Sequence, residues 1–319
     1  MTMKKRRLGN SDLETAPIVF GGNVFGWTVD KEQSFKLLDT FLDSGFNAID
    51  TADSYSHWVE GHEGGESETI IGHWMKDRKN RNEVLLITKV GSDMGKGKRD
   101  ISKDYILQAV DKSLQRLRTD YIDLYLTHWD DEVTPVEETL SAYGKLIEVG
   151  KIRWAGASNL SPERLKASLE AAKKDSRLAR YEVLEPGYNL YDRQGFEGDS
   201  AGICKEYGLG VITYYSLAAG FLSGKYQDDK DLMNSPRANM VKKYLDDRGK
   251  RILKALEEVS KKYDTTPAAL SLSWLMTRPL VTAPIASATK LEHIGSFNEA
   301  VKLNLDKESI DKLDKASRW

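Results

Sequence analysis

Short apolar runs alternate with longer amphipathic segments along most of the chain. The runs are rich in β-branched residues and cover residues 18–22, 47–50, 84–89, 122–128, 152–157, 182–186, 210–215 and 281–285. Runs of this length and composition predict β-strands that are buried on both faces. The segments between most of them space apolar residues three and four positions apart, as at Phe35, Leu38, Phe41 and Leu42, which predicts amphipathic helices.

Several predicted helices carry residues that suit helix ends. Ser102 precedes one of them, and the Ser161-Pro162 pair precedes another. A serine side chain can accept a hydrogen bond from a free amide of the first turn, and a proline there has no amide to leave unpaired. Gly45 and Gly150 follow two further helices and predict the turns that end them.

The alternation of strands and helices predicts a parallel α/β fold, either a closed barrel or an open doubly wound sheet. An open sheet that binds dinucleotides carries G-x-G-x-x-G between its first strand and the next helix. Here Gly21-Gly22 is followed by an aromatic-rich stretch instead. We therefore expect residues 1–319 to form a single α/β domain, a (β/α)8 TIM barrel with an N-terminal β-hairpin and long loops at the C-terminal ends of its strands. The polar stretch 218–250 predicts the longest of these loops, with helical turns.

Composition and charge narrow the class of protein. Of the 319 residues, 40% are hydrophobic and 30% are charged, and the formal net charge is -2, so no overall field attracts nucleic acid or an anionic membrane. No window approaches the roughly 20 apolar residues of a membrane helix, and no apolar run follows the basic residues 4–7 to form a signal peptide. The single cysteine, Cys204, excludes an intramolecular disulfide and fits a reducing compartment. We expect a soluble, cytoplasmic protein.

Polar residues collect at the C-terminal ends of the predicted strands. They are Asp50 and Tyr55 after the second strand, Lys89 at the third, His128 at the fourth, and Ser158 and Asn159 at the fifth. These ends meet at one face of a barrel. A lysine that ends an apolar strand is costly to bury unless it is paired, so Lys89 either extends to solvent or has an acidic partner. The acid and base residues at neighbouring strands favour the second alternative.

These residues resemble the catalytic tetrad of the aldo-keto reductases, namely Asp50, Tyr55, Lys89 and His128. The surrounding sequence is also similar: residues 45–55 resemble "GxNxxDTAxxY", residues 65–72 resemble "GxSExxxG", and residues 150–159 resemble "GKIRxxGxSN". The likeness runs from Leu8 to about Leu313 and is strongest to the bacterial branch related to potassium-channel beta subunits. It implies an enzyme that interconverts aldehydes or ketones and alcohols with NADPH.

The resemblance implies a role for each member of the tetrad. Tyr55 is expected to be the general acid. A free tyrosine has a pKa of about 10, and the Lys89 ammonium beside it is expected to lower that pKa toward the working range. Asp50 is expected to fix Lys89, and His128 is expected to hydrogen-bond the substrate oxygen.

The cofactor contacts implied by the resemblance are spread over the ends of six predicted strands and the loops that follow them. They are Gly22, Asn23, Asp50, Ser158, Asn159, Glu185, Tyr214, Leu217, Ala219, Gly220, Lys225, Arg237, Ser287, Thr289, Lys290 and His293. Ser158 and Asn159 match the pair that bonds the nicotinamide carboxamide, and Tyr214 matches the aromatic residue that stacks on the ring. Glu185 stands where the family commonly has Gln, so it can accept from the carboxamide but cannot donate.

The phosphates are expected at two segments. Residues 211–226 resemble the loop that wraps the pyrophosphate, for which Lys225 and Arg237 are candidate ligands. Residues 284–293 resemble a turn into a helix N-terminus, which favours phosphate. Thr289 and Lys290 would hold the 2′-phosphate, so we expect NADPH/NADP+ in preference to NADH; the alternative is that Lys290 is an ordinary surface lysine.

Aromatic residues and histidines near the tetrad are candidates for the substrate pocket. The set is Phe25, Trp27, Tyr55, His57, Trp58, His128 and Trp129. Such a lining suits an apolar or ring-shaped substrate, although aromatic residues of this kind also pack loops together. His57 and His62, with the acidic residues between and after them, match no helical zinc motif, so we expect no metal site.

Two other functions compete with the reductase. A regulatory subunit of the channel-beta type would bind NADPH with little turnover, and steady NADPH oxidation with a panel of aldehydes would separate the two. A metal-dependent barrel hydrolase would need several histidines at strand ends, whereas only His128 lies at one. The expected partner is a small-molecule carbonyl or alcohol, with no nucleic acid and no membrane. The sequence does not indicate the oligomeric state.

Overall fold

Eight parallel strands close into a barrel in the computed structural model, which describes residues 3–95, 97–226, 228–233 and 237–319. The strands are β3 (Val19–Gly21), β4 (Ala48–Asp50), β5 (Leu85–Val90), β6 (Ile122–Thr127), β7 (Ile152–Ser158), β8 (Tyr181–Glu185), β9 (Gly210–Thr213) and β10 (Val281–Ala286). They follow the chain around the barrel, and β10 closes it against β3. Each predicted apolar run overlaps one of these strands to within a few residues at either end, so the predicted TIM barrel is confirmed and the open sheet is wrong.

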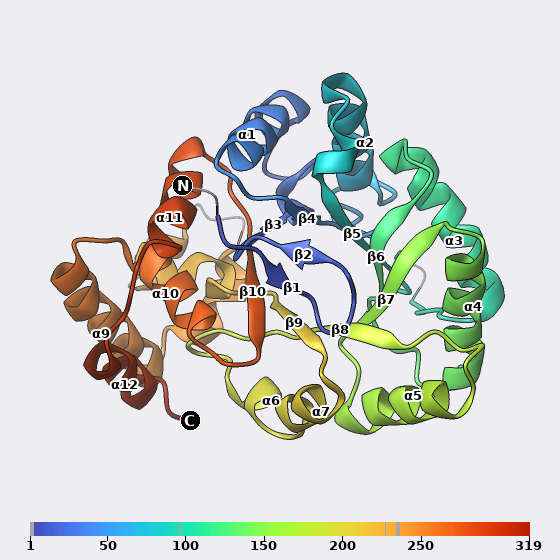
Figure 1. Ribbon diagram of the computed structural model, residues 1–319. Helices are drawn as coiled ribbons and strands as arrows, with labels where there is room; N and C mark the ends of the chain where they lie inside the picture. The colour runs from blue at the N-terminus through green and yellow to red at the C-terminus, as the bar shows by residue number, and fades with distance from the viewer. Residues whose placement is uncertain (1–2, 96, 227, 234–236) are drawn as a thin grey trace.

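Helices surround the barrel and cover its outer surface (Figure 1). The longer ones are α1 (Lys31–Asp43), α2 (Glu66–Arg78), α3 (Lys103–Leu117), α4 (Val136–Glu148), α5 (Pro162–Lys174), α7 (Asp199–Tyr207), α9 (Asp247–Tyr263), α10 (Pro267–Met276), α11 (Leu291–Ala300) and α12 (Lys307–Ala316). Ser161 caps α5 by accepting from the amide of Arg164 at 3.2 Å, as expected. None of the helices in the described part of the chain is long and apolar enough to cross a bilayer.

A two-stranded hairpin lies across the end of the barrel where the strands begin. It consists of β1 (Arg6–Arg7) and β2 (Glu14–Thr15), and it occupies the centre of the view in Figure 1. Leu8 and Leu13 of its turn are buried and join the core inside the barrel. Gly9 has a φ of +59°, and a Cβ there would lie 2.7 Å from the backbone nitrogen of Gly210. The hairpin therefore fits tightly against the strand starts, and the expected N-terminal hairpin is confirmed.

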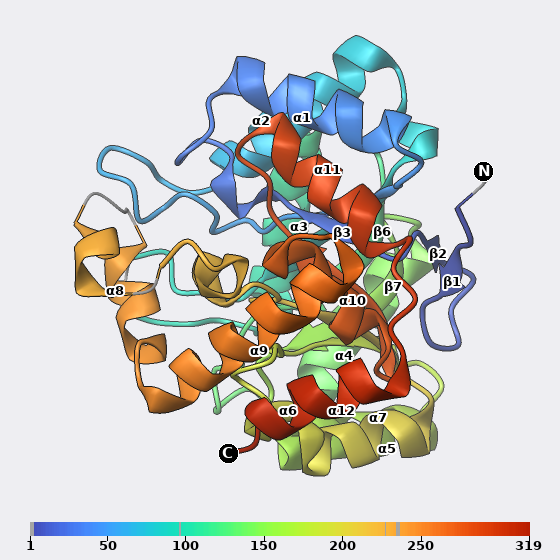
Figure 2. The same ribbon diagram turned by 90° about the vertical axis from the view of Figure 1, so that its left-hand side faces the viewer.

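The opposite end of the barrel carries the long connections. The stretch 218–250 contains η3 (Ala218–Ser223), η4 (Asp229–Leu232), α8 (Ala238–Val241) and η5 (Lys242–Tyr244), so it is a loop with helical turns as predicted. The next helix, α9, begins at Asp247, earlier than expected, because Asp246 caps it by accepting from the amide of Gly249 at 2.7 Å. Residues 227 and 234–236 of this stretch lie outside the described residues. Figure 2 shows α8 and the hairpin on opposite sides of the molecule.

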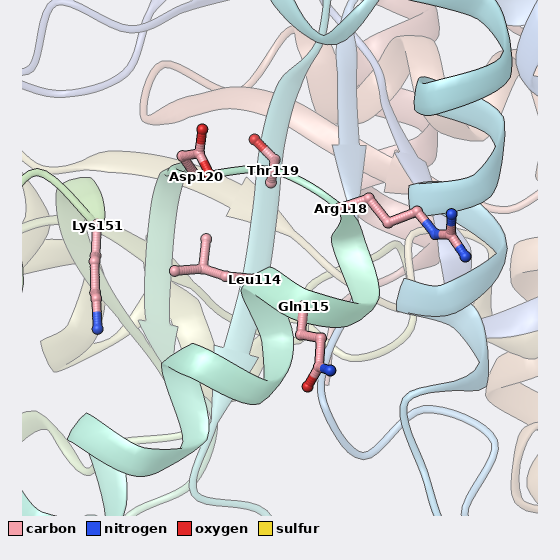
Figure 3. Close-up of a pocket in the computed structure, with 6 residues that line it drawn as sticks. All are labelled: Leu114, Gln115, Arg118, Thr119, Asp120 and Lys151. Carbon is pink, nitrogen blue, oxygen red and sulfur yellow. The ribbon is translucent and has the colours of Figure 1, made fainter.

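The remaining short helical segments are η1 (Gly22–Val24), η2 (Arg81–Glu83) and α6 (Gln194–Glu197). A depression of about 370 Å³ lies beside the starts of β6 and β7 (Figure 3). Its lining includes Thr119 and Asp120, which lie shortly before β6, and Lys151, which directly precedes β7. It is therefore at the hairpin end of the barrel and contains none of the expected catalytic residues.

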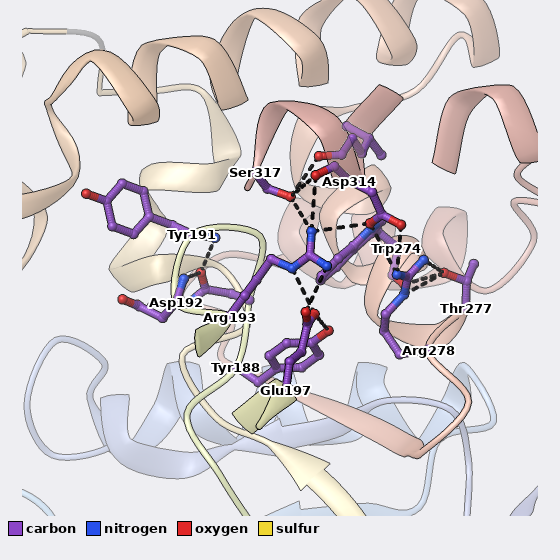
Figure 4. A network of polar contacts seen from close by, with 12 residues as sticks. Tyr188, Tyr191, Asp192, Arg193, Glu197, Trp274, Thr277, Arg278, Asp314 and Ser317 are labelled. Carbon is purple, nitrogen blue, oxygen red and sulfur yellow. Dashed lines mark hydrogen bonds and ion pairs between the residues drawn. The ribbon is translucent and has the colours of Figure 1, made fainter. Parts of the chain in front are cut away.

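A buried arginine joins the last helix to the segment after β8 (Figure 4). Arg193 donates to Glu197 Oε1 at 2.8 Å on one side and to Ser317 Oγ at 2.7 Å on the other. Asp314 of α12 accepts from Trp274 Nε1 at 2.9 Å and pairs with Arg278 at 3.1 Å. These contacts hold α12 against α10 and the β8 connection.

Candidate active site

The four expected catalytic residues lie together at the end of the barrel opposite the hairpin. Asp50 ends β4, Lys89 lies near the end of β5, Tyr55 lies in the connection after β4, and His128 follows β6. The Lys89 ammonium is fully buried and lies 2.6 Å from each carboxylate oxygen of Asp50. It also donates to the Tyr55 hydroxyl at 3.0 Å. Lys89 is thus paired inside the protein and does not extend to solvent.

Backbone bonds fix the connection that carries Tyr55. The amides of Thr51 and Asp53 bond to the β5 carbonyls of Ile87 and Lys89 at 2.9 and 3.2 Å, so the segment continues beside β5 past the end of β4. Ser56 then adopts a φ of 75° and donates its hydroxyl to the carbonyl of Phe25 at 2.8 Å. These bonds point Tyr55 toward Lys89, and its ring lies 5.9 Å from that of His128.

A second carboxylate reaches the same ammonium from across the barrel. Glu185, the last residue of β8, places Oε1 3.3 Å from Lys89 Nζ, and its side chain is only 2% exposed. Its other oxygen, Oε2, is buried and has no hydrogen-bond partner among the described residues. Sequence reasoning had assigned Glu185 to the cofactor and missed this contact with Lys89. The alternation of side-chain directions along β8 could place Glu185 toward the interior of the barrel. No local sequence pattern relates Glu185 to a residue of β5.

Burial and the excess of negative charge decide the protonation states. Burial raises the pKa of Asp50, opposed by Lys89. Burial and the charge of Asp50 raise the pKa of Glu185 to about 8. Burial acts to lower the pKa of Lys89, but the two carboxylates outweigh it and hold that pKa well above its ordinary value. Burial and then the Lys89 charge keep the pKa of His128 well below its ordinary value, so His128 is neutral at neutral pH.

The pKa of Tyr55 is raised, which is the opposite of what the neighbouring Lys89 alone predicts. Burial is the largest cause; Lys89 acts to lower the pKa, and Asp50 and Glu185 act against Lys89. The expectation was wrong because it considered the ammonium without the desolvation of the phenol and without the second carboxylate. At neutral pH the phenol therefore keeps its proton.

Residues expected to contact a nicotinamide adjoin Glu185. Ser158 donates to the carbonyl of Glu185 at 2.9 Å, and the Asn159 amide donates to the carbonyl of His128 at 2.9 Å. Tyr214 donates its hydroxyl to Asn159 Oδ1 at 2.7 Å. A Cβ at Gly187 would lie 3.1 Å from the Tyr214 ring, so the glycine leaves room for that ring. These residues form one connected group beside the tetrad.

The ends of β3 and β10 meet on the other side of the tetrad. Gly22 begins η1 and is followed by Asn23, whose Oδ1 accepts from Ser287 Oγ at 2.6 Å. The Thr289 amide donates to His293 Nδ1 at 3.2 Å, and Lys290 is the residue before α11. These expected cofactor residues are therefore neighbours in space.

Cations from three segments converge near His293. Burial is the main cause of its lowered pKa, followed by the charges of Lys225 and Lys290, and Arg237 contributes as well. Leu217 precedes η3, while Ala219 and Gly220 within it have φ angles of 56° and 99° and bring the chain back toward Lys225. A group of cations gathered from separate loops suits a polyanion such as a dinucleotide phosphate. Together with the unpartnered oxygen of Glu185, this donor set fits a phosphorylated nicotinamide cofactor.

Most of the expected substrate-pocket residues gather around Tyr55. The Trp27 and Trp58 rings meet edge to face at 5.6 Å, and Trp58 lies 6.1 Å from the Tyr55 ring and 5.5 Å from that of His57. Trp129 lies 6.3 Å from His128.

Phe25 does not join this group. It is fully buried and stacks on Phe20 at 5.3 Å in the core outside the barrel. The turn at Gly26, with a φ of +74°, separates it from Trp27. The position of Phe25 therefore does not support the expectation that this residue lines the substrate pocket. Arg237 lies 5.7 Å from the Trp27 ring, so this expected phosphate ligand also borders the aromatic group.

Comparison with known proteins gives consistent matches over almost the whole chain. The sequence model of the Aldo/keto reductase family matches residues 17–318. The aldo-keto reductase YhdN of Bacillus subtilis is 30% identical over 294 residues, which cover 90% of this chain and 84% of that protein. A probable voltage-gated potassium channel subunit beta of Oryza sativa subsp. japonica is 29% identical, covering 98% of this chain and 96% of that protein. The norsolorinic acid reductase of Aspergillus flavus is 29% identical, covering 96% and 79%.

Proposed function

The chain belongs to the aldo/keto reductase family, and from this premise we propose that it is an NADPH-dependent oxidoreductase that interconverts aldehydes or ketones and alcohols, with Tyr55 as the general acid. The observation that carries the proposal is the 3.0 Å contact between the Tyr55 hydroxyl and the buried Lys89 ammonium, which Asp50 holds from the other side. A bound NADPH would supply the hydride. The residues of the chain would supply the proton and stabilise the charge that develops.

The protonation states of the tetrad suit this chemistry. Because the pKa of Tyr55 is raised, the phenol holds its proton until a substrate oxygen with greater proton affinity lies beside it. Lys89 then stabilises the phenolate that remains, and Asp50 keeps the ammonium in place. Neutral His128 can hydrogen-bond the substrate oxygen without adding a second positive charge beside Lys89.

The preference for NADPH over NADH rests on the cations near His293. Lys225, Lys290 and Arg237 come from separate loops, and Lys290 precedes the first turn of α11, whose amides favour a phosphate group. We assign Thr289 and Lys290 to the 2′-phosphate that distinguishes NADPH. We assign Ser158, Asn159, Glu185 and Tyr214 to the nicotinamide end.

Replacement of the phenol tests the proposal directly. We expect Tyr55→Phe to lower kcat by about 10²-fold or more, because the proton donor is lost. Binding of NADPH, measured by quenching of protein fluorescence, should stay within about twofold. Tyr207→Phe is the matched control, since Tyr207 lies on α7 and bonds to Glu170 away from the tetrad. Near-full turnover of Tyr55→Phe with a panel of aldehydes would remove Tyr55 from this role.

A second function is a regulatory subunit that binds NADPH with little turnover. The observation in its favour is the similarity to the Oryza sativa channel subunit over nearly the full length of both chains. Steady oxidation of NADPH by the wild-type protein with any of a panel of aromatic and aliphatic aldehydes supports the enzyme. Tight NADPH binding without such oxidation supports the regulatory subunit.

A further inference from the structure

The buried charges around Lys89 do not balance. One ammonium faces two carboxylates, those of Asp50 and Glu185, and all three side chains are at most 2% exposed. Two carboxylates that close to one another in a buried site cannot both be ionised without a large electrostatic cost. One of the two therefore holds a proton when the site contains only residues of this chain.

The geometry indicates which carboxylate carries that proton. Asp50 accepts from Lys89 through both oxygens at 2.6 Å, which is the best arrangement for an ionised carboxylate. Glu185 lies farther from Lys89, at 3.3 Å, and shares a side-chain hydrogen bond with Asp50, while its Oε2 is buried with no partner in the described part of the chain. A buried oxygen without a hydrogen-bond donor costs much more free energy as part of an anion than as part of a neutral carboxyl group. Glu185 is thus the group whose charge can change.

We propose that Glu185 makes this site bind the oxidised nicotinamide cofactor more tightly than the reduced one, by becoming a carboxylate when the cofactor carries a positive ring. The inference rests on the proposed function, since it requires a nicotinamide beside Glu185. The oxidised ring is a cation and the reduced ring is neutral, so only the former offsets the surplus negative charge. Binding of the oxidised form therefore releases a proton from Glu185: the carboxyl O–H bond breaks, its electron pair stays on the carboxylate, and the proton passes to water or buffer.

This property depends on the residue type that the chain has at position 185. A glutamine could still bond to an amide, but it carries no charge in either cofactor state. The same geometry with a neutral side chain would leave Asp50 and Lys89 as a balanced pair, with no preference from this source. Glu185 thus adds a preference for the oxidised cofactor that a glutamine at this position would not supply.

The pH range of the effect follows from the groups that face Glu185. The pKa of Glu185 itself is raised to about 8 by burial and by Asp50. Lys89 and Tyr55 have raised pKa values, and burial raises that of Tyr214 to about 12, so all three stay protonated between about pH 7 and about pH 9. His128 stays neutral across the same range. The preference for the oxidised form should therefore increase through about pH 8.

Equilibrium binding without substrate tests this inference. We would measure the dissociation constants of NADP+ and NADPH by protein fluorescence at about pH 7 and about pH 9, and use their ratio. Phosphate groups are common to both forms, so their titration cancels in the ratio. In the wild type, we expect the preference for NADP+ to rise about tenfold between these pH values, which corresponds to about one pKa unit of coupling. Glu185→Gln should show a ratio that does not change with pH.

A matched control and a second readout make the test sharper. Glu182→Gln removes a buried carboxylate from the other end of β8, where it pairs with Arg180, and should keep the wild-type pH dependence. Calorimetry of NADP+ binding near pH 8, in two buffers with different ionisation enthalpies, should show proton release by the wild type that is absent from Glu185→Gln. This wild-type measurement stands even if the variant does not fold.

The outcomes separate the two proposals. A wild-type ratio that is the same at both pH values, or a Glu185→Gln variant that keeps the dependence, overturns the inference and leaves the proposed function intact. Failure of the wild type to bind either nucleotide contradicts the proposed function, and the inference falls with it. A pH-dependent ratio with matching proton release, both lost in Glu185→Gln, supports the inference.

Discussion

The two carboxylates around Lys89 should substitute for one another in stabilising the folded protein. In Asp50→Asn the ammonium loses its contacts of 2.6 Å with a charged partner, but Glu185 remains 3.3 Å away. The pKa of Glu185 should then fall, because the repulsion from Asp50 is gone, and Glu185 becomes the anion. We therefore expect Asp50→Asn to lower the free energy of unfolding by only about 1–2 kcal/mol.

The double variant should behave differently. Glu185→Gln alone keeps Asp50 as the charged partner and should change the free energy of unfolding by less than about 1 kcal/mol. With both substitutions, the fully buried ammonium has no anionic partner, and the loss should reach about 3–5 kcal/mol. The central values of these ranges give a coupling of about 2 kcal/mol between the two sites in a double-mutant cycle.

Urea denaturation near pH 7, followed by both fluorescence and circular dichroism, measures these four free energies. The control cycle combines Asp50→Asn with Glu182→Gln, which lies at the other end of β8 and pairs with Arg180. We expect the control pair to be additive within about 0.5 kcal/mol. Additivity of the Asp50 and Glu185 substitutions within the same margin would refute the view that the two carboxylates share one cation.

Two further predictions concern the cofactor and the fold. Lys290→Ala should raise KM for NADPH about tenfold or more with little change in KM for NADH, because a charge-assisted contact with the 2′-phosphate is lost. Steady-state kinetics with both cofactors measure the two constants. An unchanged ratio of KM for NADPH to KM for NADH contradicts the assignment. Arg116→Met should lower the free energy of unfolding by about 3–5 kcal/mol, because it leaves the fully buried Glu68 without its ion pair. Urea denaturation would show this loss, and the matched exposed substitution Lys36→Met, which breaks an exposed pair with Glu32, should cost less than about 1 kcal/mol.

The sequence predicted the barrel because each strand is a local run of apolar residues bounded by turns. The grouping of the four expected catalytic residues could also be predicted from the sequence, because the strand ends of one barrel meet at one face. The contact of Glu185 with Lys89 could not be predicted from the sequence. It joins β8 to β5 across the barrel, and no spacing of residues along the chain indicates it. The packing of Phe25 was also not evident from its closeness to Trp27 in the sequence: the turn at Gly26 lies between them, and the Phe25 ring stacks on Phe20 in the core.

The raised pKa of Tyr55 shows the same limit in electrostatics. The lysine beside the phenol could be identified from the sequence, but burial and a second carboxylate reverse the direction that the lysine alone would give. Sequence motifs can predict which residues contact one another. They do not predict how completely those residues are buried, and burial is the largest cause of the Tyr55 pKa shift.

The hairpin across the strand starts gives the molecule a sealed end and an accessible end. Leu8 and Leu13 fill the interior of the barrel at this end, and α8 lies on the far side (Figure 2). A fluorescent label on the hairpin, or a linker that attaches the hairpin to a solid support, would therefore lie at the sealed end. Attachment through the hairpin would therefore place the support at the end of the barrel opposite Asp50 and Lys89.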